Sequence, residues 1–120
     1  MTGQLTTHVL DTRDGRPAAN MRIELWAVET GSETRTLLKT MRTNGEGRTD
    51  APLLAGLELR AGVYELVFAV GEYFARCEVP TSTPPFLGRV PIRFGVADAH
   101  AHYHVPLLVS PWAYSTYRGS

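Results

Sequence analysis

The chain has 120 residues and carries 12 Lys or Arg against 12 Asp or Glu, so its formal net charge is zero. A chain with balanced charge gives no indication of the basic surface that binds nucleic acids or anionic membranes. No apolar run approaches the roughly 20 residues of a transmembrane helix. This length predicts one domain, residues 1–120, large enough to fold around its own hydrophobic core.

The sequence also predicts the compartment in which the protein works. The only cysteine, Cys77, cannot form a disulfide within the chain, so nothing indicates an oxidising compartment. The first ten residues lack the basic start and the apolar stretch of a signal peptide. We therefore expect a cytoplasmic protein.

Short strands separated by turns are predicted for the first half of the chain. Leu5–Leu10 is rich in β-branched residues, and Met21–Glu29 alternates as a strand with one buried face does. Asp-Gly and Asn-Gly pairs predict turns within residues 11–15 and 44–47. A further strand is expected at Thr34–Thr43.

The second half adds more strands and one short helix. Thr49–Ala61 is expected to hold a short strand and a loop, and Gly62–Val70 is the best candidate for a central strand. Gly71–Cys77 has the composition of a helix of about two turns. Arg89–Val96 predicts another strand, and Pro91, which cannot donate to a ladder, indicates an edge strand or the beginning of a strand. The whole pattern predicts an all-β sandwich of two antiparallel sheets with one short helix.

Three histidines recur at every second position near the C-terminus, at His100, His102 and His104. On a β-strand their imidazoles would share one face, with neighbours about 7 Å apart. A Ser-Pro pair then breaks the strand, and a second short strand, Tyr114–Tyr117, leads to the last three residues.

Three segments resemble the transthyretin-like family and, within it, the 5-hydroxyisourate hydrolases. They are LTTHVLDT at residues 5–12, GR at residues 47–48, and HYHVPLL…YSTYRGS over residues 102–120. The resemblance implies the family's β-sandwich and a homotetramer with its sites at subunit interfaces. It also implies a small-molecule substrate, 5-hydroxyisourate, whose ring is opened to 2-oxo-4-hydroxy-4-carboxy-5-ureidoimidazoline in urate catabolism, without a metal or an organic cofactor.

The same resemblance implies an active site, with catalytic His8, Arg48, His104 and Ser120, and with His8, Arg48 and Tyr117 binding the substrate. An imidazole exchanges a proton near neutral pH, and a guanidinium offers a planar fork of donors to carbonyls and anions. We therefore expect the two imidazoles to divide the activation and orientation of a water molecule, while the guanidinium stabilises the oxyanion. The resemblance implies no role for His100 and His102.

Two other functions remain open from the sequence. A His-x-His-x-His segment on one strand face presents nitrogens to Zn²⁺, although no carboxylate is clearly paired with it. A non-catalytic carrier of a small molecule is the other alternative. A carrier needs an apolar channel and has no use for a pair of proton-transfer groups, so His8, Arg48 and His104 together argue against it.

Overall fold

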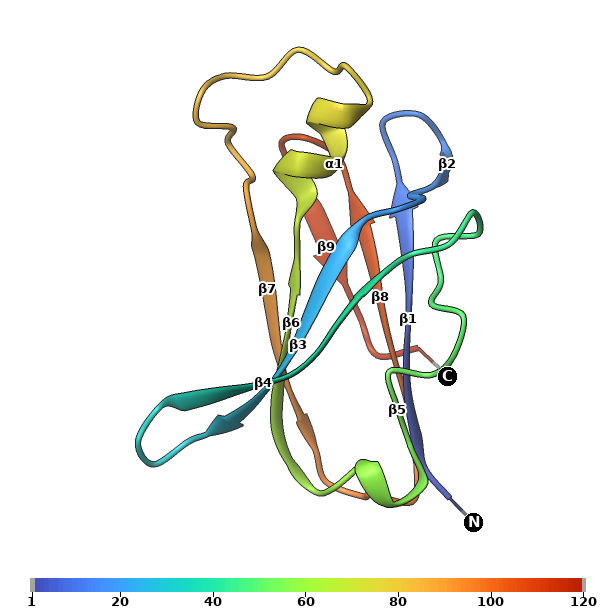
Figure 1. The fold of residues 1–120 in the computed structure, drawn as a ribbon, viewed down its shortest axis with the longest axis vertical. Helices are drawn as coiled ribbons and strands as arrows, with labels where there is room; N and C mark the ends of the chain where they lie inside the picture. Colours follow the sequence, from blue (N-terminus) through green and yellow to red (C-terminus); the bar gives the residue numbers. More distant parts are fainter. Residues whose placement is uncertain (1, 120) are drawn as a thin grey trace.

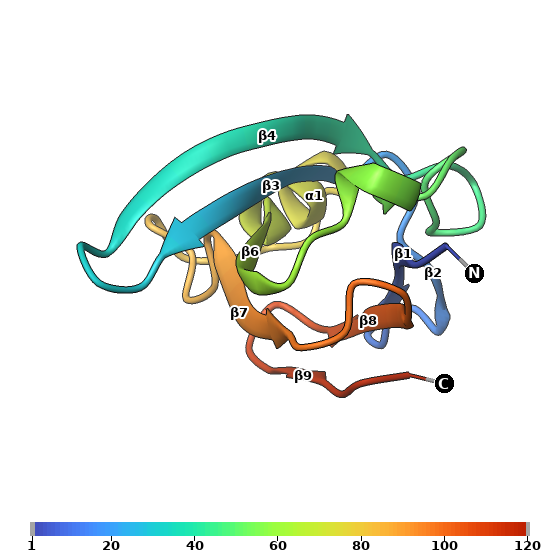
Figure 2. The same cartoon turned by 90° about the horizontal axis from the view of Figure 1, so that it is seen from below.

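The computed structural model describes residues 2–119 and folds them into two β-sheets packed face to face (Figures 1 and 2). The strands are β1 (Gln4–Asp11), β2 (Arg16–Pro17), β3 (Arg22–Glu29), β4 (Thr34–Arg42), β5 (Leu54–Ala55), β6 (Gly62–Phe68), β7 (Val90–Val96), β8 (His102–Val109) and β9 (Tyr114–Thr116). The helix α1 spans Val70–Arg76, and a 3₁₀ turn, η1, spans Gly56–Glu58. The predicted all-β sandwich with a short helix is confirmed.

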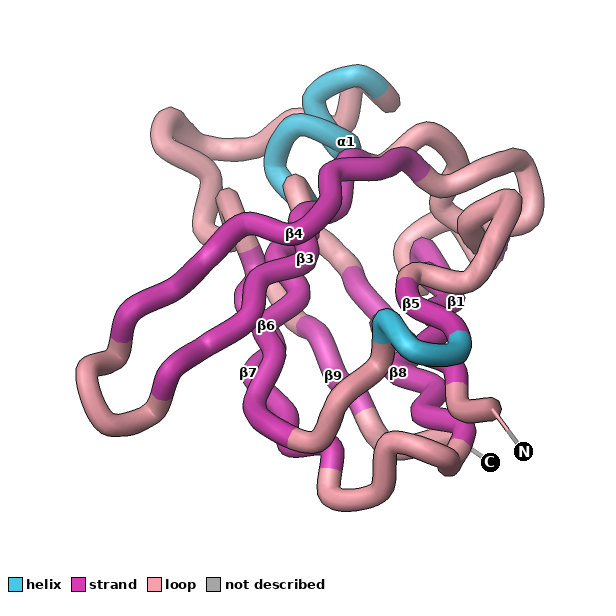
Figure 3. The backbone as a smooth tube through the Cα atoms, turned by 60° about the horizontal axis from the view of Figure 1, so that its bottom comes forward, coloured by secondary structure: helices cyan, strands magenta, loops and turns pink. Residues whose placement is uncertain are grey.

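Each sheet contributes one face to the core. The first sheet has the order β2-β1-β8-β9, with β5 also paired with β1, and the second has the order β4-β3-β6-β7. Side chains alternate along β1, so that every second residue is buried and the residues between them are half-buried on the outer face. The helix closes one end of the sandwich with Val70, Tyr73 and Phe74, and η1 lies at the opposite end, between β5 and β6 (Figure 3).

One strand pair differs from the antiparallel arrangement that the sequence predicted. β1 and β8 run parallel, with Gln4 opposite His102, Thr6 opposite His104 and His8 opposite Pro106. Parallel neighbours need a long connection, and here the chain builds the whole second sheet between the two strands. The first sheet is therefore mixed rather than wholly antiparallel.

The outer face of the second sheet is more closely covered than the sequence predicted. Glu24 and Glu65 are each only 7% exposed. Glu24 accepts hydrogen bonds from Arg22 (2.7 Å) and from the indole N–H of Trp26 (3.1 Å). Glu65 accepts one from Arg35 (2.7 Å), whose guanidinium lies 4.3 Å from the centre of the Trp26 ring. Buried carboxylates need such partners, so β3 is covered on both faces.

The predicted edge strand and helix lie where the sequence placed them. β7 forms one edge of the second sheet, and Pro91 within it is exposed. α1 begins one residue earlier than the predicted segment. Within residues 2–119, no helix is long and apolar enough to cross a bilayer.

Candidate active site

The outer faces of β1 and β8 bring two of the predicted site histidines to the same surface. His8 lies two residues after Thr6 on β1, and Thr6 is the register partner of His104 on β8. Because the strands are parallel and side chains alternate, all three side chains point away from the core. Segments nearly a hundred residues apart thus contribute to one face of the mixed sheet.

The hydroxyl of Thr6 connects two histidines of β8. Its Oγ1 lies 2.8 Å from Nε2 of His102 and 2.8 Å from Nδ1 of His104. The centres of the two imidazole rings are 6.2 Å apart. The family resemblance implied no role for Thr6 or His102. The signal that could have found Thr6 is its spacing. It stands two residues before His8 and therefore lies on the same face of a strand.

The tautomer of neutral His8 follows from its hydrogen bond. Its Nε2 lies 2.9 Å from the backbone oxygen of Glu46. A carbonyl oxygen only accepts, so Nε2 carries the hydrogen and the neutral ring offers a bare Nδ1. The strand thus provides one imidazole acceptor whose orientation the 44–48 turn fixes.

Asn44 organises the turn that carries Arg48. The side-chain oxygen of Asn44 accepts hydrogen bonds from the backbone N–H groups of Glu46 (2.9 Å) and Arg48 (3.2 Å). The backbone N–H of Asn44 donates to the Arg48 carbonyl (2.7 Å). Gly47 has a φ of +76°, and a Cβ there would lie 2.4 Å from the backbone oxygen of Val9. Only glycine allows this approach to β1. The turn therefore places the Arg48 guanidinium beside the outer face that carries His8, His102 and His104, called the histidine face below.

Partial burial and nearby ionisable groups lower the pKa of His104. The pKa of His104 lies below its usual value of 6.5, first because the ring is partly buried, and then because the Arg48 cation and the His102 and His8 rings lie near it. Each of these neighbours disfavours a positive charge on the ring. The structure therefore brings His8, Arg48 and His104 within range of electrostatic interaction.

The C-terminal segment packs against His104. The backbone N–H of Gly119 donates to the His104 carbonyl (2.8 Å), and a Cβ on Gly119 would lie 2.6 Å from Cδ2 of the His104 ring. Tyr117, two residues before Gly119, is 61% exposed. The predicted catalytic residue Ser120 lies outside the described residues, so its role stays a prediction.

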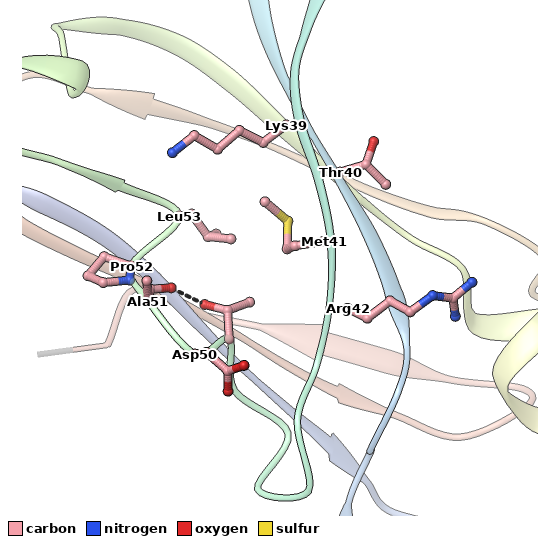
Figure 4. Close-up of a pocket in the computed structure, with 9 residues that line it drawn as sticks. Lys39, Thr40, Met41, Arg42, Asp50, Ala51, Pro52 and Leu53 are labelled. Atoms are coloured by element: carbon pink, nitrogen blue, oxygen red, sulfur yellow. Dashed lines mark hydrogen bonds between the residues drawn. The ribbon is translucent and has the colours of Figure 1, made fainter.

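Two hollows lie on opposite sides of residues 49–52. A hollow of about 200 Å³ adjoins Arg48 and is lined also by Gln4 and Thr6 of β1. A larger hollow, about 530 Å³, separates residues 49–53 from Lys39–Arg42 of β4 (Figure 4). No imidazole lines either hollow, but the smaller one adjoins Thr6, which is hydrogen-bonded to His102 and His104.

His100 does not join the other histidines on the strand. β8 begins at His102, and His100 lies in the preceding turn, where its backbone N–H donates to Asp98 (2.9 Å). Only two of the three imidazoles therefore share the predicted face. Within residues 2–119, no three His, Cys, Asp or Glu side chains are grouped to hold a metal ion, so the geometry does not support the zinc alternative.

The fold and the face define a class of protein: a two-sheet β-sandwich of transthyretin type, with imidazoles and a guanidinium on its mixed sheet. The HIUase/Transthyretin family matches residues 5–119, and the chain belongs to this family.

Similar proteins include a hydrolase, a synthase and a transthyretin. A protein of Ralstonia nicotianae named 5-hydroxyisourate hydrolase is 58% identical, over 98% of this chain and 99% of its own length. The crystal structure of (S)-allantoin synthase matches with a TM-score of 0.93 and 50% identity over 99% of this chain, which spans only 44% of that longer protein. Sea bream transthyretin in complex with thyroxine matches with a TM-score of 0.85 and 26% identity, over 97% of this chain and 94% of its own.

Proposed function

We propose that this chain is a hydrolase that opens the six-membered ring of 5-hydroxyisourate to give 2-oxo-4-hydroxy-4-carboxy-5-ureidoimidazoline in urate catabolism. The carrying observation is that His8 and His104 share one outer sheet face, while Arg48, from a distant turn, acts on His104 electrostatically and borders a hollow with Gln4 and Thr6 of that face. The name of the Ralstonia relative, at 58% identity over nearly the full length, supports the same substrate.

The chemistry assigned to the three side chains is the hydrolysis of a cyclic amide. A lowered pKa leaves His104 unprotonated at neutral pH, so it is available to take a proton from water. His8 offers its Nδ1 to orient that water. Arg48 binds the ring carbonyls and stabilises the negative charge that develops on the attacked carbonyl oxygen.

We assign Tyr117 and Ser120 to the rim of the same site. Tyr117 is exposed and follows β9, so its ring is free to pack on or hydrogen-bond to a planar substrate. Ser120 follows Gly119, which packs on His104. The proposal includes no metal and no organic cofactor.

We further propose that the chain works as a homotetramer with its sites at subunit interfaces. β9 is the edge strand of the first sheet, and three exposed aromatic side chains, Trp112, Tyr114 and Tyr117, lie in or beside it. An exposed edge with large aromatic side chains is typical of a surface that another copy covers. The cytoplasmic location and the single domain 1–120 also stay predictions.

A carrier function is the competing proposal, and the similarity to a transthyretin that binds thyroxine is the observation behind it. The two functions differ in the polar groups they need. An apolar channel for a hormone-like ligand gains nothing from a guanidinium and two imidazoles, because their desolvation costs free energy. The composition of the histidine face therefore favours hydrolysis.

The test is the decay of 5-hydroxyisourate freshly generated by urate oxidation, followed with and without the protein. We expect His104→Ala to lower turnover by roughly 10²–10⁴-fold, the usual contribution of a positioned general base. Circular dichroism checks that this variant is folded. His100→Ala, a histidine removed from the neighbouring turn, is the matched control and should retain wild-type turnover.

Two results would contradict the proposal. Decay that is no faster with the wild-type protein than without it would favour a carrier. Near-normal turnover in a folded His104→Ala variant would refute the assignment of the site while leaving the activity itself standing.

A further inference from the structure

We propose that Thr6 and His102 form a proton relay with His104, in which Thr6 fixes the tautomer of His104 and His102 receives the positive charge. The inference rests on the proposed hydrolase function and deepens it. Thr6 and His102 are positioning residues, because they act on the reacting atoms only through His104.

The hydroxyl group of Thr6 has a single hydrogen but lies at hydrogen-bond distance from two imidazole rings. A hydroxyl carries one hydrogen, yet Oγ1 of Thr6 is 2.8 Å from a ring nitrogen of His102 and 2.8 Å from a ring nitrogen of His104. It must donate to one nitrogen and accept an N–H from the other. The tautomers of the two neutral rings are therefore coupled.

The two permitted arrangements give His104 opposite capabilities. In the first, Nδ1–H of His104 donates to Thr6, and Thr6 donates to Nε2 of His102. The remaining nitrogen of His104, Nε2, is then bare and acts as a base. In the second, every hydrogen bond is reversed, and Nε2 of His104 carries a hydrogen that it donates as an acid. Nε2 of His104 makes no hydrogen bond within residues 2–119, so it is available to substrate and water.

Passing from the first arrangement to the second balances as a proton transfer. Nε2 of His104 takes a proton from the water molecule, whose hydroxide adds to the ring carbonyl carbon. At the same time Nδ1 gives its hydrogen to Thr6, and Thr6 gives its own to Nε2 of His102. His104 stays neutral, while His102 becomes an imidazolium. When the C–N bond breaks, Nε2–H of His104 protonates the leaving nitrogen, and the two other hydrogens move back.

The surroundings of His104 oppose a positive charge on its own ring. His104 is partly buried, and it faces Arg48 from the 44–48 turn, His8 from β1 and His102 on its own strand. These groups lower the pKa of His104 and oppose a positive charge there. His102 is exposed to water, which solvates an imidazolium there, and Arg118 donates to its backbone oxygen (3.4 Å).

The fold holds this chain of hydrogen bonds in register. Thr6 and His104 are register partners across the parallel β1–β8 pair. Gln4 and His102, two residues earlier on each strand, are the preceding partners on the same face. Gly119 lies against the other side of the His104 ring, so that the ring cannot swing away from Thr6 without displacing the backbone. The tautomer is thus set by fixed strands rather than by a mobile loop.

Three variants of β1 test the role of Thr6. Thr6→Val removes the hydroxyl at nearly constant shape and should lower kcat by roughly 10- to 100-fold with little change in KM, the usual cost of losing a group that fixes a histidine tautomer. Thr6→Ser keeps the hydroxyl and should restore kcat. Thr7→Val is the matched control: the Thr7 hydroxyl donates to the Val105 carbonyl (2.7 Å) on the core side of the same strand pair. It should lose stability but keep kcat.

A measurement independent of turnover tests the hydrogen bonds directly. Nitrogen-15 NMR of the histidine rings should show one dominant tautomer of His104 in wild type and in Thr6→Ser, and a mixture in Thr6→Val. His102→Gln still offers a donor and an acceptor to Thr6 but cannot take a charge. It should retain the His104 tautomer and lose roughly tenfold in kcat, part of the contribution of proton transfer.

The outcomes separate the relay from the proposed function. Wild-type kcat in either Thr6→Val or His102→Gln, or an unchanged His104 spectrum in Thr6→Val, overturns the relay even if His104→Ala is inactive. If the wild-type protein fails to accelerate the decay, the hydrolase proposal falls. The NMR comparison then still decides whether Thr6 couples the two tautomers.

Discussion

Gly119→Ala is the change for which the structure gives the most direct magnitude. An added Cβ would lie 2.6 Å from Cδ2 of His104. Carbon atoms pack at about 3.5–4.0 Å, so the ring or the backbone must move by about 1 Å. Gly119 has no positive φ that a side chain would strain, so the effect is one of space alone. Because a 1 Å misplacement of a reacting group can cost about 100-fold, we expect kcat to fall by that order.

The assay for this prediction compares Gly119→Ala with a glycine that has room. A Cβ on Gly95 of β7 would meet nothing within 4 Å, so Gly95→Ala should keep wild-type kcat. Thermal unfolding of both variants separates loss of fold from loss of activity. A folded Gly119→Ala protein whose kcat lies within twofold of wild type would refute the view that the C-terminal segment holds the His104 ring in position.

Two further changes concern the turn that carries the guanidinium. Arg48→Gln removes a cation that opposes protonation of His104, so the pKa of His104 should rise toward 6.5, as an NMR titration of its ring protons would show. The pKa of His104 is lower in the folded protein than in the unfolded chain, so the folded protein loses stability as the pH falls from 6.5 toward that lower pKa. This loss should be smaller in Arg48→Gln than in wild type. Asn44→Ala removes the acceptor of two backbone N–H groups. We expect it to lower the free energy of unfolding by about 1–2 kcal/mol in denaturant titrations and to lower kcat/KM roughly tenfold through misplacement of Arg48.

Each of these changes has a result that would contradict it. A His104 pKa that stays the same or falls in Arg48→Gln would mean that the guanidinium does not act on that ring. Unchanged kcat/KM in Asn44→Ala would show that Arg48 needs no support from the turn. Asn44→Asp keeps an acceptor oxygen and so serves as the conservative comparison.

The strands and turns could be predicted because local patterns determine them. The β-branched residues of Leu5–Leu10 indicate a strand, the alternation over Met21–Glu29 shows which of its residues share a face, and Asp-Gly and Asn-Gly pairs indicate turns. The direction in which β1 pairs with β8 could not be predicted in this way. Pairing depends on how the whole intervening chain crosses the sandwich, and no local pattern encodes that path.

The candidate site was predictable where it follows a family motif and hidden where it depends on pairing. His8, Arg48 and His104 stand in segments that resemble the family, and the structure brings them together. Thr6 has no chemistry of its own that a sequence pattern would single out. It becomes important only because the register sets it opposite His104, at hydrogen-bond distance from two rings.

The pairing of β1 with β8 has a consequence for the birth of the protein on the ribosome. Thr6 meets its partner only after nearly a hundred further residues have been made. Until then β1 can pair only with β2 and β5, and the face that joins Thr6 and His8 to His102 and His104 is incomplete. Contacts of such long sequence separation slow folding, so this face should form late in folding, only after β8 has been made.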